Sequence, residues 1–241
     1  MATLIFDIET IGDDWSEFDD STKSVLTRWI DRTAQSEDER SIQLQALQDR
    51  LGLSPLTGSI VSIAMYDLER SIGAVYFVSD DEDEFKDNNF LYKSRTEKML
   101  LEDFWSSARS YDTFVTFNGR AFDVPFLLHR SVVCGVVPSI ELGRRRYLSQ
   151  QAMPYHVDLQ DELTLYGAMY RRPPLHMFCR AYGIKSPKDT MDGYQVAEFF
   201  QSKKFRDLAR YNAADVIATT KLYEIWKKHL APRSWLNVVD Y

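Results

Sequence analysis

The order of apolar and polar positions along the chain predicts strands that alternate with helices. Short apolar runs bounded by polar residues are typical of strands, and apolar residues at helical spacing are typical of helices. The predicted strands are residues 3–9, 59–66, 72–78 and 113–117. The predicted helices are residues 100–108, 124–130, 161–170, 175–182, 192–200 and 204–230. This mixture of strands and helices predicts an α/β fold.

Residues 13–57 separate the first predicted strand from the second and have helical character. Apolar residues at helical spacing begin at Val25. Ser36 and Glu39 form a capping box ahead of a second apolar run. We interpret this stretch as a helical insertion. Because the chain has no internal repeat, low-complexity tract or Pro/Gly-rich linker, we expect one domain over residues 1–241.

Composition and charge narrow the classes of protein. The net charge is −7, so the chain lacks the broad basic field that holds duplex DNA, and any nucleic-acid binding must be local. The acidic run at residues 80–89 predicts a solvated loop. Two cysteines are too few for a disulfide framework, which favours a reduced, cytoplasmic protein. No run approaches the roughly 18 apolar residues of a membrane span, so no membrane contact is expected.

Two carboxylates interrupt the first predicted strand, whose sequence at residues 4–10 is LIFDIET. Successive strand side chains point to opposite faces, so Asp7 and Glu9 share a face with Ile5 and are neighbours. Two unit charges about 4 Å apart repel by roughly 4 kcal/mol at an effective dielectric near 20. The pair therefore needs a cation, a shared proton or open water.

Two further acids lie in apolar surroundings. Asp215 is four residues after Tyr211, so the two side chains lie on one face of the last predicted helix, and that face is otherwise apolar. Asp123 lies where a strand has become a helix, because Pro125 suits the first helical turn. A buried carboxylate without a partner is costly, so Asp215 also needs a cation.

Three motifs contain these acids: FDIET at residues 6–10, FNGRAFD at 117–123 and YNAAD at 211–215. In this order they resemble the three exonuclease motifs of the DEDD superfamily of 3′-5′ exonucleases, tyrosine subclass. The chain resembles a stand-alone proofreading exonuclease domain of a family B DNA polymerase. The segments YHVDLQDEL and SPKDTMDG also resemble those of the free-standing, proofreader-like branch of this superfamily. The resemblance implies a ribonuclease H-like α/β fold with a mixed central sheet flanked by helices.

The resemblance also implies the cofactor and the role of each acid. Four carboxylates would bind two divalent ions, Mg²⁺ or Mn²⁺, which prefer oxygen ligands. Asp7 would bridge both ions, and Glu9 and Asp215 would complete the site that activates water. Asp123 would hold the second ion directly or through water, and Tyr211 would orient the nucleophile. Four negative charges and two divalent ions balance, so the site could accept a phosphate.

The function implied is 3′-5′ exonuclease activity that releases nucleoside 5′-monophosphates. We expect single-stranded DNA with a free 3′ end as the substrate. An exoribonuclease is the alternative within enzymes, because the same acids could serve it. A non-catalytic single-strand-binding module of a repair or replication complex is the alternative from another class. Recruitment by a polymerase or a helicase would suit each of these.

Candidate substrate contacts lie near the acids. Phe117 could stack on the terminal nucleotide and Asn118 could hydrogen-bond to it. The basic tract Arg144, Arg145 and Arg146 could bind the phosphates of a strand, and a solvated basic loop is the equal alternative.

Structural roles compete with these chemical ones. Asp7 and Glu9 could lie at the end of a strand that extends into solvent. Asp123 could cap a helix, and Tyr211 could be a core aromatic with its hydroxyl at the surface. His156 and Asp158 are two residues apart, but no Cys or His cluster joins them, so we expect a structural or supporting role rather than a separate metal site.

Overall fold

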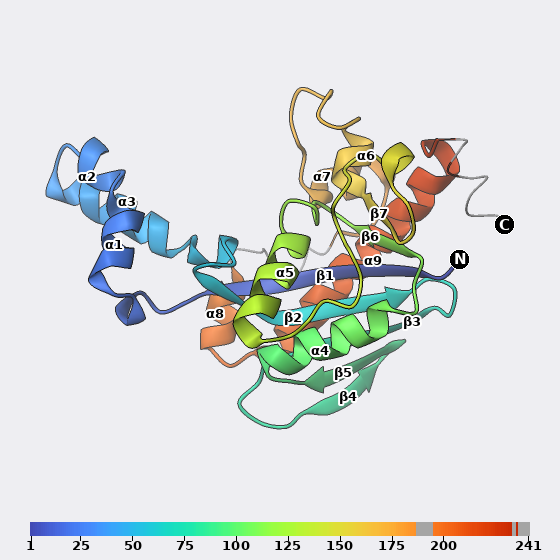
Figure 1. The fold of residues 1–241 in the computed structure, drawn as a ribbon, viewed down its shortest axis with the longest axis horizontal. Coiled ribbons are helices and arrows are strands. Elements are labelled where there is room, and N and C mark those ends of the chain that lie inside the picture. Colours follow the sequence, from blue (N-terminus) through green and yellow to red (C-terminus); the bar gives the residue numbers. More distant parts are fainter. Residues whose placement is uncertain (187–194, 233–234, 236–241) are drawn as a thin grey trace.

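A computed structural model describes residues 1–186, 195–232 and 235, and within these residues the chain forms a seven-stranded mixed sheet flanked by helices (Figure 1). The strands are β1 (Thr3–Gly12), β2 (Gly58–Asp67), β3 (Ile72–Phe77), β4 (Glu84–Asp87), β5 (Phe90–Ser94), β6 (Thr113–Thr116) and β7 (Tyr155–Asp158). Their order across the sheet is β4-β5-β3-β2-β1-β6-β7. β1 is an inner strand, antiparallel to β2 and parallel to β6, and β6 is parallel to β7.

Two layers of helices cover the two faces of the sheet. Leu4, Phe6 and Ile8 of β1 pack on α4 (Glu97–Ala108) and α5 (Asp123–Cys134). Ile5 lies in the other core cluster, with residues of three helices. These helices are α6 (Leu159–Leu163), α7 (Leu175–Tyr182) and α9 (Phe205–His229). The predicted alternation of β1 is confirmed, and it directs Asp7 and Glu9 to the face that α9 covers.

The strands and the long helices agree with the sequence pattern. The hairpin of β2 and β3 and the strand β6 form where the apolar runs predict them. Thr96 caps α4, and Pro125 lies in the first turn of α5. The predicted helices at 175–182 and 204–230 correspond to α7 and α9. In the part of the chain that the structure describes, no helix is long and apolar enough to span a bilayer.

Two predictions of local structure are wrong. Residues 80–89 are not all loop, because β4 forms there and pairs with β5: Phe85 stacks on Tyr92 with ring centroids 4.5 Å apart, which anchors the acidic strand. The helix predicted at 161–170 ends at Leu163, because Leu165 and Tyr166 have left-handed backbone conformations.

The prediction of a helix at 192–200 is tested only in part, because residues 192–194 lie outside the described residues. The described part contains α8 (Val196–Gln201). The SPKDTMDG segment also lies outside them, apart from Ser186.

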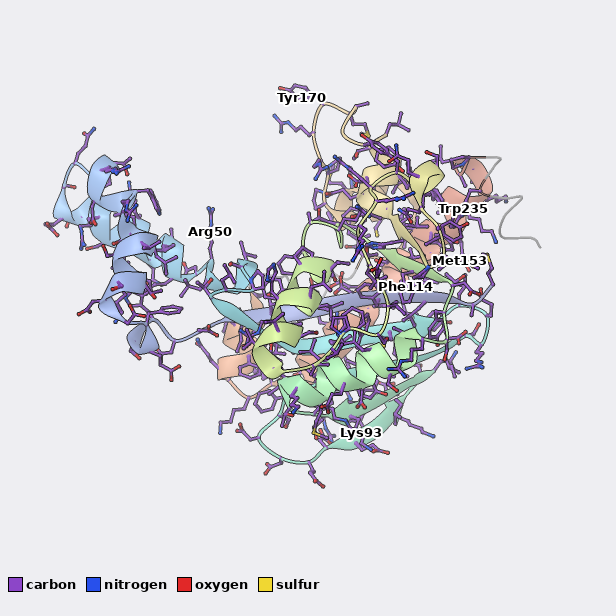
Figure 2. All side chains as sticks on the ribbon, viewed as in Figure 1. Arg50, Lys93, Phe114, Met153, Tyr170 and Trp235 are labelled. Atoms are coloured by element: carbon purple, nitrogen blue, oxygen red, sulfur yellow. The ribbon has the colours of Figure 1, made fainter. Side chains whose placement is uncertain are left out.

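Residues 13–57, here called the helical arm, join β1 to β2 and project away from the sheet (Figure 1). The arm contains the helices η1 (Trp15–Glu17), α1 (Asp20–Thr27), α2 (Ile30–Thr33), α3 (Glu37–Gln48) and η2 (Leu51–Leu53). Ser36 caps α3 by accepting the backbone N–H of Glu39, as the capping pattern predicts. Arg50 marks the segment that returns from the arm to the sheet (Figure 2).

The base of the arm is held tightly against the end of β1. The Thr10 hydroxyl donates to the Gly52 carbonyl at 2.6 Å, and the Asp13 N–H donates to the Thr57 carbonyl at 2.9 Å. A Cβ atom on Gly58 would lie only 2.6 Å from the Ile11 carbonyl oxygen, so the two chain segments can approach this closely only with glycine there. The arm therefore begins and ends beside the residues that follow Glu9.

Candidate functional site

The four predicted acids come together in one cleft, with a volume of about 430 Å³. One carboxylate oxygen from each of Asp7, Glu9 and Asp215 lies within 4.8 Å of the other two. Asp123 is tied to the same strand, because its Oδ1 accepts the backbone N–H of Ile8 at 3.1 Å. Residues more than 200 positions apart in the sequence thus meet where β1 faces α9.

The register of the sheet explains how two acids fit on an inner strand. Asp7 lies opposite Ala64 and Glu9 lies opposite Ser62, both on β2. These small residues share the face of the acids, so they leave room for the carboxylates beneath α9. The register shifts between Glu9 and Thr10, which is a bulge of the kind that often lies beside active sites.

The surroundings of the acids in the cleft disfavour their ionised forms. Burial, followed by the charges of Asp123, Asp215 and Glu9, raises the pKa of Asp7 well above its usual range. Burial and the charges of Asp215 and Asp123 do the same to the pKa of Glu9. Burial raises the pKa of Asp123 to about 7, and the charge of Asp158 adds to the effect. No ion pair reaches Asp7, Glu9 or Asp123 within the described ranges 1–186, 195–232 and 235. A bound cation would relieve this repulsion.

Tyr211 points its hydroxyl at the acids. It lies one helical turn before Asp215 on α9, it is 8% exposed, and it hydrogen-bonds to Asp215. Burial raises its pKa, and the charges of Asp215, Glu9 and Asp7 raise it further. A core aromatic with its hydroxyl at the surface is therefore not what the structure shows.

Asn212 belongs to the site and was missed in the sequence. Its Nδ2 donates to Asp7 Oδ2 at 2.7 Å, and its Oδ1 accepts from the Ser62 hydroxyl at 2.8 Å. The side chain is fully buried. A signal was present, because Asn212 is a polar residue three positions before Asp215, next to Tyr211 on the helix that carries both. It fixes the orientation of one Asp7 oxygen.

Asp123 begins α5 without acting as its N-cap residue. The N-cap position is Phe122, which makes no side-chain capping bond. The Asp123 side chain is 2% exposed and bonds to the backbone of β1 instead. The alternative that Asp123 serves only as a helix cap therefore does not explain where its side chain lies.

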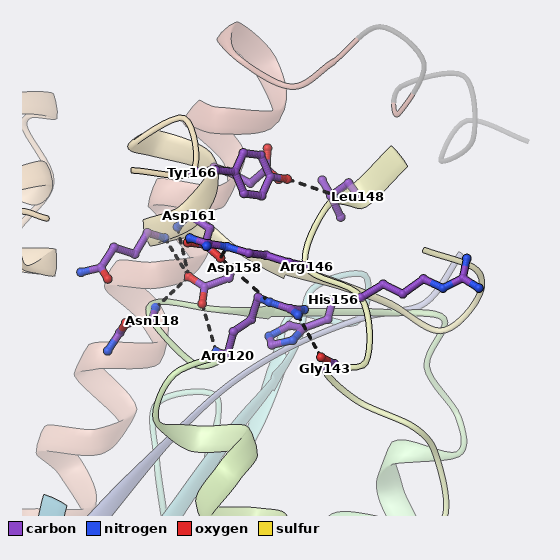
Figure 3. Close-up of polar contacts among 12 residues, drawn as sticks. Asn118, Arg120, Gly143, Arg146, Leu148, His156, Asp158, Asp161 and Tyr166 are labelled. Carbon is purple, nitrogen blue, oxygen red and sulfur yellow. Dashed lines mark hydrogen bonds and ion pairs between the residues drawn. The ribbon is translucent and has the colours of Figure 1, made fainter. Parts of the chain in front are cut away.

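The loop before Asp123 carries Phe117 and Asn118, and both line the cleft. Asn118 has a left-handed backbone conformation with φ of 65°. Asp158 holds it there, because its two carboxylate oxygens accept the N–H groups of Asn118 at 2.9 Å and Arg120 at 3.0 Å (Figure 3). A Cβ atom on Gly119 would lie 2.4 Å from the Thr116 hydroxyl oxygen, so the turn requires glycine.

His156 has a structural position beneath this loop. It is buried, and its Nε2 lies 2.8 Å from the Thr116 hydroxyl. Burial lowers its pKa to about 3, so its ring is neutral. Asp158 also caps α6 by accepting the N–H of Gln160 at 2.9 Å. His156 and Asp158 thus support the cleft from below, as expected of a structural pair.

The basic tract lies beside the cleft rather than in it. Arg144 is 76% exposed and pairs with Glu141 at 2.8 Å. Arg145 donates to the Gln150 carbonyl at 2.6 Å. Arg146 makes two bonds to Asp161, at 2.9 and 2.5 Å (Figure 3). None of the three lines the acidic cleft, but Arg146 lines a neighbouring cavity that it shares with Asn118.

The walls of the cleft come from opposite parts of the molecule. Leu53, at the base of the helical arm, lies on one wall. Gln160 and His176, from α6 and α7, lie on the other. The Nδ1 atom of His176 is 2.8 Å from the Ser186 hydroxyl. The cleft thus combines the four acids with apolar and polar side chains on its walls.

Comparisons with known proteins agree with this arrangement. A family model described as a predicted 3′-5′ exonuclease related to the exonuclease domain of PolB matches residues 64–236. The matched range includes the motifs of Asp123 and Asp215 and begins after the motif of Asp7 and Glu9. A search of curated proteins gave no match.

Among solved structures, the family B DNA polymerase from the hyperthermophilic archaeon Pyrobaculum calidifontis has a similar fold. The TM-score is 0.59 and the sequence identity is 18%. The alignment covers 93% of this chain and 24% of the polymerase chain. This likeness confirms the predicted ribonuclease H-like α/β fold. The chain spans about a quarter of the length of the polymerase that it matches.

Proposed function

Because the chain belongs to the family of predicted 3′-5′ exonucleases related to the exonuclease domain of PolB, we propose that it removes nucleotides from the 3′ end of a nucleic acid strand. The products would be nucleoside 5′-monophosphates. One observation carries the proposal: Asp7, Glu9 and Asp215 place carboxylate oxygens within 4.8 Å of one another, and Asp123 is anchored beside them. Such a cluster is the acidic floor that phosphodiester hydrolysis with divalent cations requires.

The donor set fits two divalent cations. All four side chains offer hard oxygen ligands, which suit Mg²⁺ or Mn²⁺. We assign Asp7, Glu9 and Asp215 to one cation, and Asp7 with Asp123 to the second. When bound, such ions neutralise the carboxylates and stabilise the attacking and leaving oxygens of the phosphodiester. The raised pKa values of Asp7 and Glu9 support this fit, because buried acids that repel one another gain most from a cation.

Other side chains of the cleft would position the reactants. A phenol is protonated at neutral pH even at the ordinary pKa near 10, and the pKa of Tyr211 is raised, so Tyr211 would act as a hydrogen-bond donor that orients the attacking water. Asn212 would keep one oxygen of Asp7 in a fixed direction, since Ser62 holds its amide. Phe117 would stack on the terminal base, and Asn118 would hydrogen-bond to the terminal nucleotide.

A single strand, rather than a duplex, is the substrate that we propose. The net charge of the chain is −7, and the helical arm contributes ten acidic and five basic residues. A duplex needs a broad basic surface, whereas one strand end needs only a narrow cleft and local contacts. Single-stranded DNA is our first choice, and RNA is the alternative that the same acids would serve.

The organisation of the chain supports a single exonuclease domain. We propose that residues 1–241 form one exonuclease domain in which the helical arm is an insertion between β1 and β2. Cys134 and Cys179 are free thiols, which suits the reducing conditions of a cytoplasmic location. A polymerase or helicase could recruit such a domain to strand ends.

A direct assay tests reaction, direction, cofactor and substrate together. Purified protein is incubated with 5′-labelled single-stranded DNA or RNA of matched sequence, with Mg²⁺, Mn²⁺ or a chelator. We expect a ladder that shortens from the 3′ end, that needs the metal ion and that is lost in Asp7→Asn. Binding of the strand without shortening would instead support a non-catalytic module. Internal cuts would contradict the exonuclease proposal.

A further inference from the structure

Three arginines converge on one buried carboxylate; Figure 3 labels two of them, Arg120 and Arg146, beside Asp161. Asp161 of α6 is 6% exposed. Arg146 bonds to both of its oxygens, Arg172 approaches at 3.1 Å and Arg120 at 3.9 Å. The arginines come from three separate loops of the chain, so the fold brings them together.

The cluster keeps hydrogen-bond donors that its acids do not occupy. Asp158 and Glu162 are the other carboxylates nearby; Asp158 accepts backbone N–H groups and Glu162 accepts the hydroxyl of Tyr166. Among the described residues, Asp161 is therefore the carboxylate that holds the three guanidinium groups. Each guanidinium carries five N–H donors; Arg172 bonds through Nη2 alone, and the buried Nη1 of Arg120 has no hydrogen-bond partner among the described residues. The cluster therefore has donors left for an anion.

The position of the cluster relates it to the cleft. A cavity of about 240 Å³ is lined by Arg120, Arg146 and Arg172, together with Asn118. Asn118 also lines the acidic cleft, so the two cavities share a wall. The side chains of Arg146 and Arg172 are 40% and 46% exposed, which lets a ligand reach them from solvent.

From this geometry we propose that the cavity of Arg120, Arg146 and Arg172, here called the arginine cavity, binds a backbone phosphate of the strand whose 3′ end lies in the acidic cleft. The phosphate belongs to a nucleotide on the 5′ side of the one removed. This inference rests on the proposed exonuclease function and adds a phosphate contact outside the acidic cleft. Guanidinium groups match phosphate oxygens with paired, planar donors. The acidic arm on the other side of the cleft repels a strand, so the arginine side is its favoured path.

Arg172→Ala is the variant of choice, because the bidentate pair of Arg146 and Asp161 remains and the fold is retained. Arg109→Ala is the matched control: it removes the same charge from an exposed position at the end of α4. Two substrates separate the cavities. One is a single strand of about ten nucleotides, within the usual site size. The other is the p-nitrophenyl ester of thymidine 5′-monophosphate, which has no further phosphate.

In Arg172→Ala we expect the KM for the oligonucleotide to rise about tenfold with kcat unchanged, as for one lost charged contact. The slope of log KM against log salt should fall by about 1. Hydrolysis of the ester should not change, and Arg109→Ala should match the wild type on both substrates. Equal behaviour of Arg172→Ala and Arg109→Ala, or an equal loss on both substrates, would overturn the inference while the exonuclease function stands.

Two further outcomes are decisive. If the wild type hydrolyses neither substrate with Mg²⁺ or Mn²⁺, the proposed function fails and the inference fails with it. Inorganic phosphate distinguishes a free anion from a strand. If it raises the Tm of the wild type but not of Arg172→Ala, while both enzymes have the same KM for the oligonucleotide, the arginine cavity is a site for free phosphate and the strand proposal is wrong.

Discussion

Two groups of buried acids lie on either side of the loop at residues 117–122, and they differ in the side chains that surround them. Asp161 meets three guanidinium groups, and Asp158 accepts backbone N–H groups. Asp7 and Glu9 instead face other acids, which together with burial raise their pKa values. The fold can supply arginines to a buried carboxylate and does so nearby. The group that contains Asp7 and Glu9, here called the unbalanced group, is therefore where a cation from solvent is needed. Asp158 and Asp161 are here called the balanced group.

Both groups owe their place to the sheet. β1, β6 and β7 are parallel, so their carboxyl ends lie at the same edge. Asn118 and Asp158 lie at or just beyond the ends of β6 and β7, and Glu9 lies three residues before the end of β1. Ligand sites of α/β sheets commonly lie at this edge. The difference between the two groups is thus one of neighbouring side chains rather than of location.

The largest effect is expected when an unbalanced acid is neutralised. Asp7→Asn removes the ligand assigned to both cations, so kcat should fall about 10³-fold or more. Without metal the same variant should be more stable than the wild type, because one repelling charge is gone. Steady-state kinetics and urea unfolding in chelator check the two effects. Asp38→Asn, an exposed acid in the first turn of α3, is the control; it should leave kcat unchanged and should not raise the stability. Wild-type kcat in Asp7→Asn would remove Asp7 from the mechanism.

Tyr211→Phe probes whether the unbalanced group also needs a hydroxyl. The variant should bind metal as the wild type does and lower kcat about 10²-fold, since a positioned donor is lost. Metal titration and kinetics measure the two quantities. Tyr170→Phe removes a hydroxyl from a side chain that is 93% exposed and should have no effect. An unchanged rate in Tyr211→Phe would contradict its assigned role.

Neutralising a balanced acid should have the opposite effect on stability. Asp161→Asn leaves three guanidinium groups without their carboxylate. Because Arg146 and Arg172 are partly exposed, we expect a loss of about 2 kcal/mol in the free energy of unfolding, less than for a fully buried pair. Urea unfolding gives the value. Glu141→Gln breaks an exposed pair with Arg144 and should cost almost nothing. A gain in stability in Asp161→Asn would erase the distinction between the two groups.

The pH dependence of the metal-free protein is a smaller effect with a definite sign. The pKa of Asp123 is about 7 in the folded protein and near 4 when unfolded, so the folded state binds the extra proton between these values. The free energy of unfolding should therefore fall as the pH rises from about 4 to above 7, and Asp7 and Glu9 act in the same direction.

Urea unfolding in chelator at several pH values measures this slope. Saturating Mn²⁺ should abolish the slope, because bound cations favour the ionised acids. Asp123→Asn should flatten it in the absence of metal. If the metal-free protein became more stable as the pH rises from about 4 to above 7, this would contradict the claim that the ionised acids of the cleft repel one another.

The sequence predicts the acidic site better than its surroundings. Strand alternation alone places Asp7 and Glu9 on one face, and helical spacing places Asp215 on the face of Tyr211. These are local rules, and the structure confirms the faces that they assign. The resemblance of the three motifs supplies the rest, because no local rule brings Asp123 to β1.

Contacts between distant segments account for the misses. The acidic strand β4 pairs with β5, and Arg206 of α9 adds to its support by pairing with Asp83 at 2.6 Å and lying over Phe85 at 4.6 Å. Neither contact can be inferred from the acidic run alone. The bond of Asn212 to Asp7 and the support of Asn118 by Asp158 likewise depend on how the elements meet. Arg146 is a similar case, since its partner Asp161 is visible only in the fold.

Calorimetric titration of Mn²⁺ into the metal-free protein tests the central claim most directly, which is that the four acids of the cleft hold two divalent cations. The account predicts uptake of two ions per chain, with protons released because the pKa values of Asp7 and Glu9 are raised. It also predicts that Asp7→Asn weakens the uptake of both ions. No uptake by the wild type, or full uptake by Asp7→Asn, would contradict it.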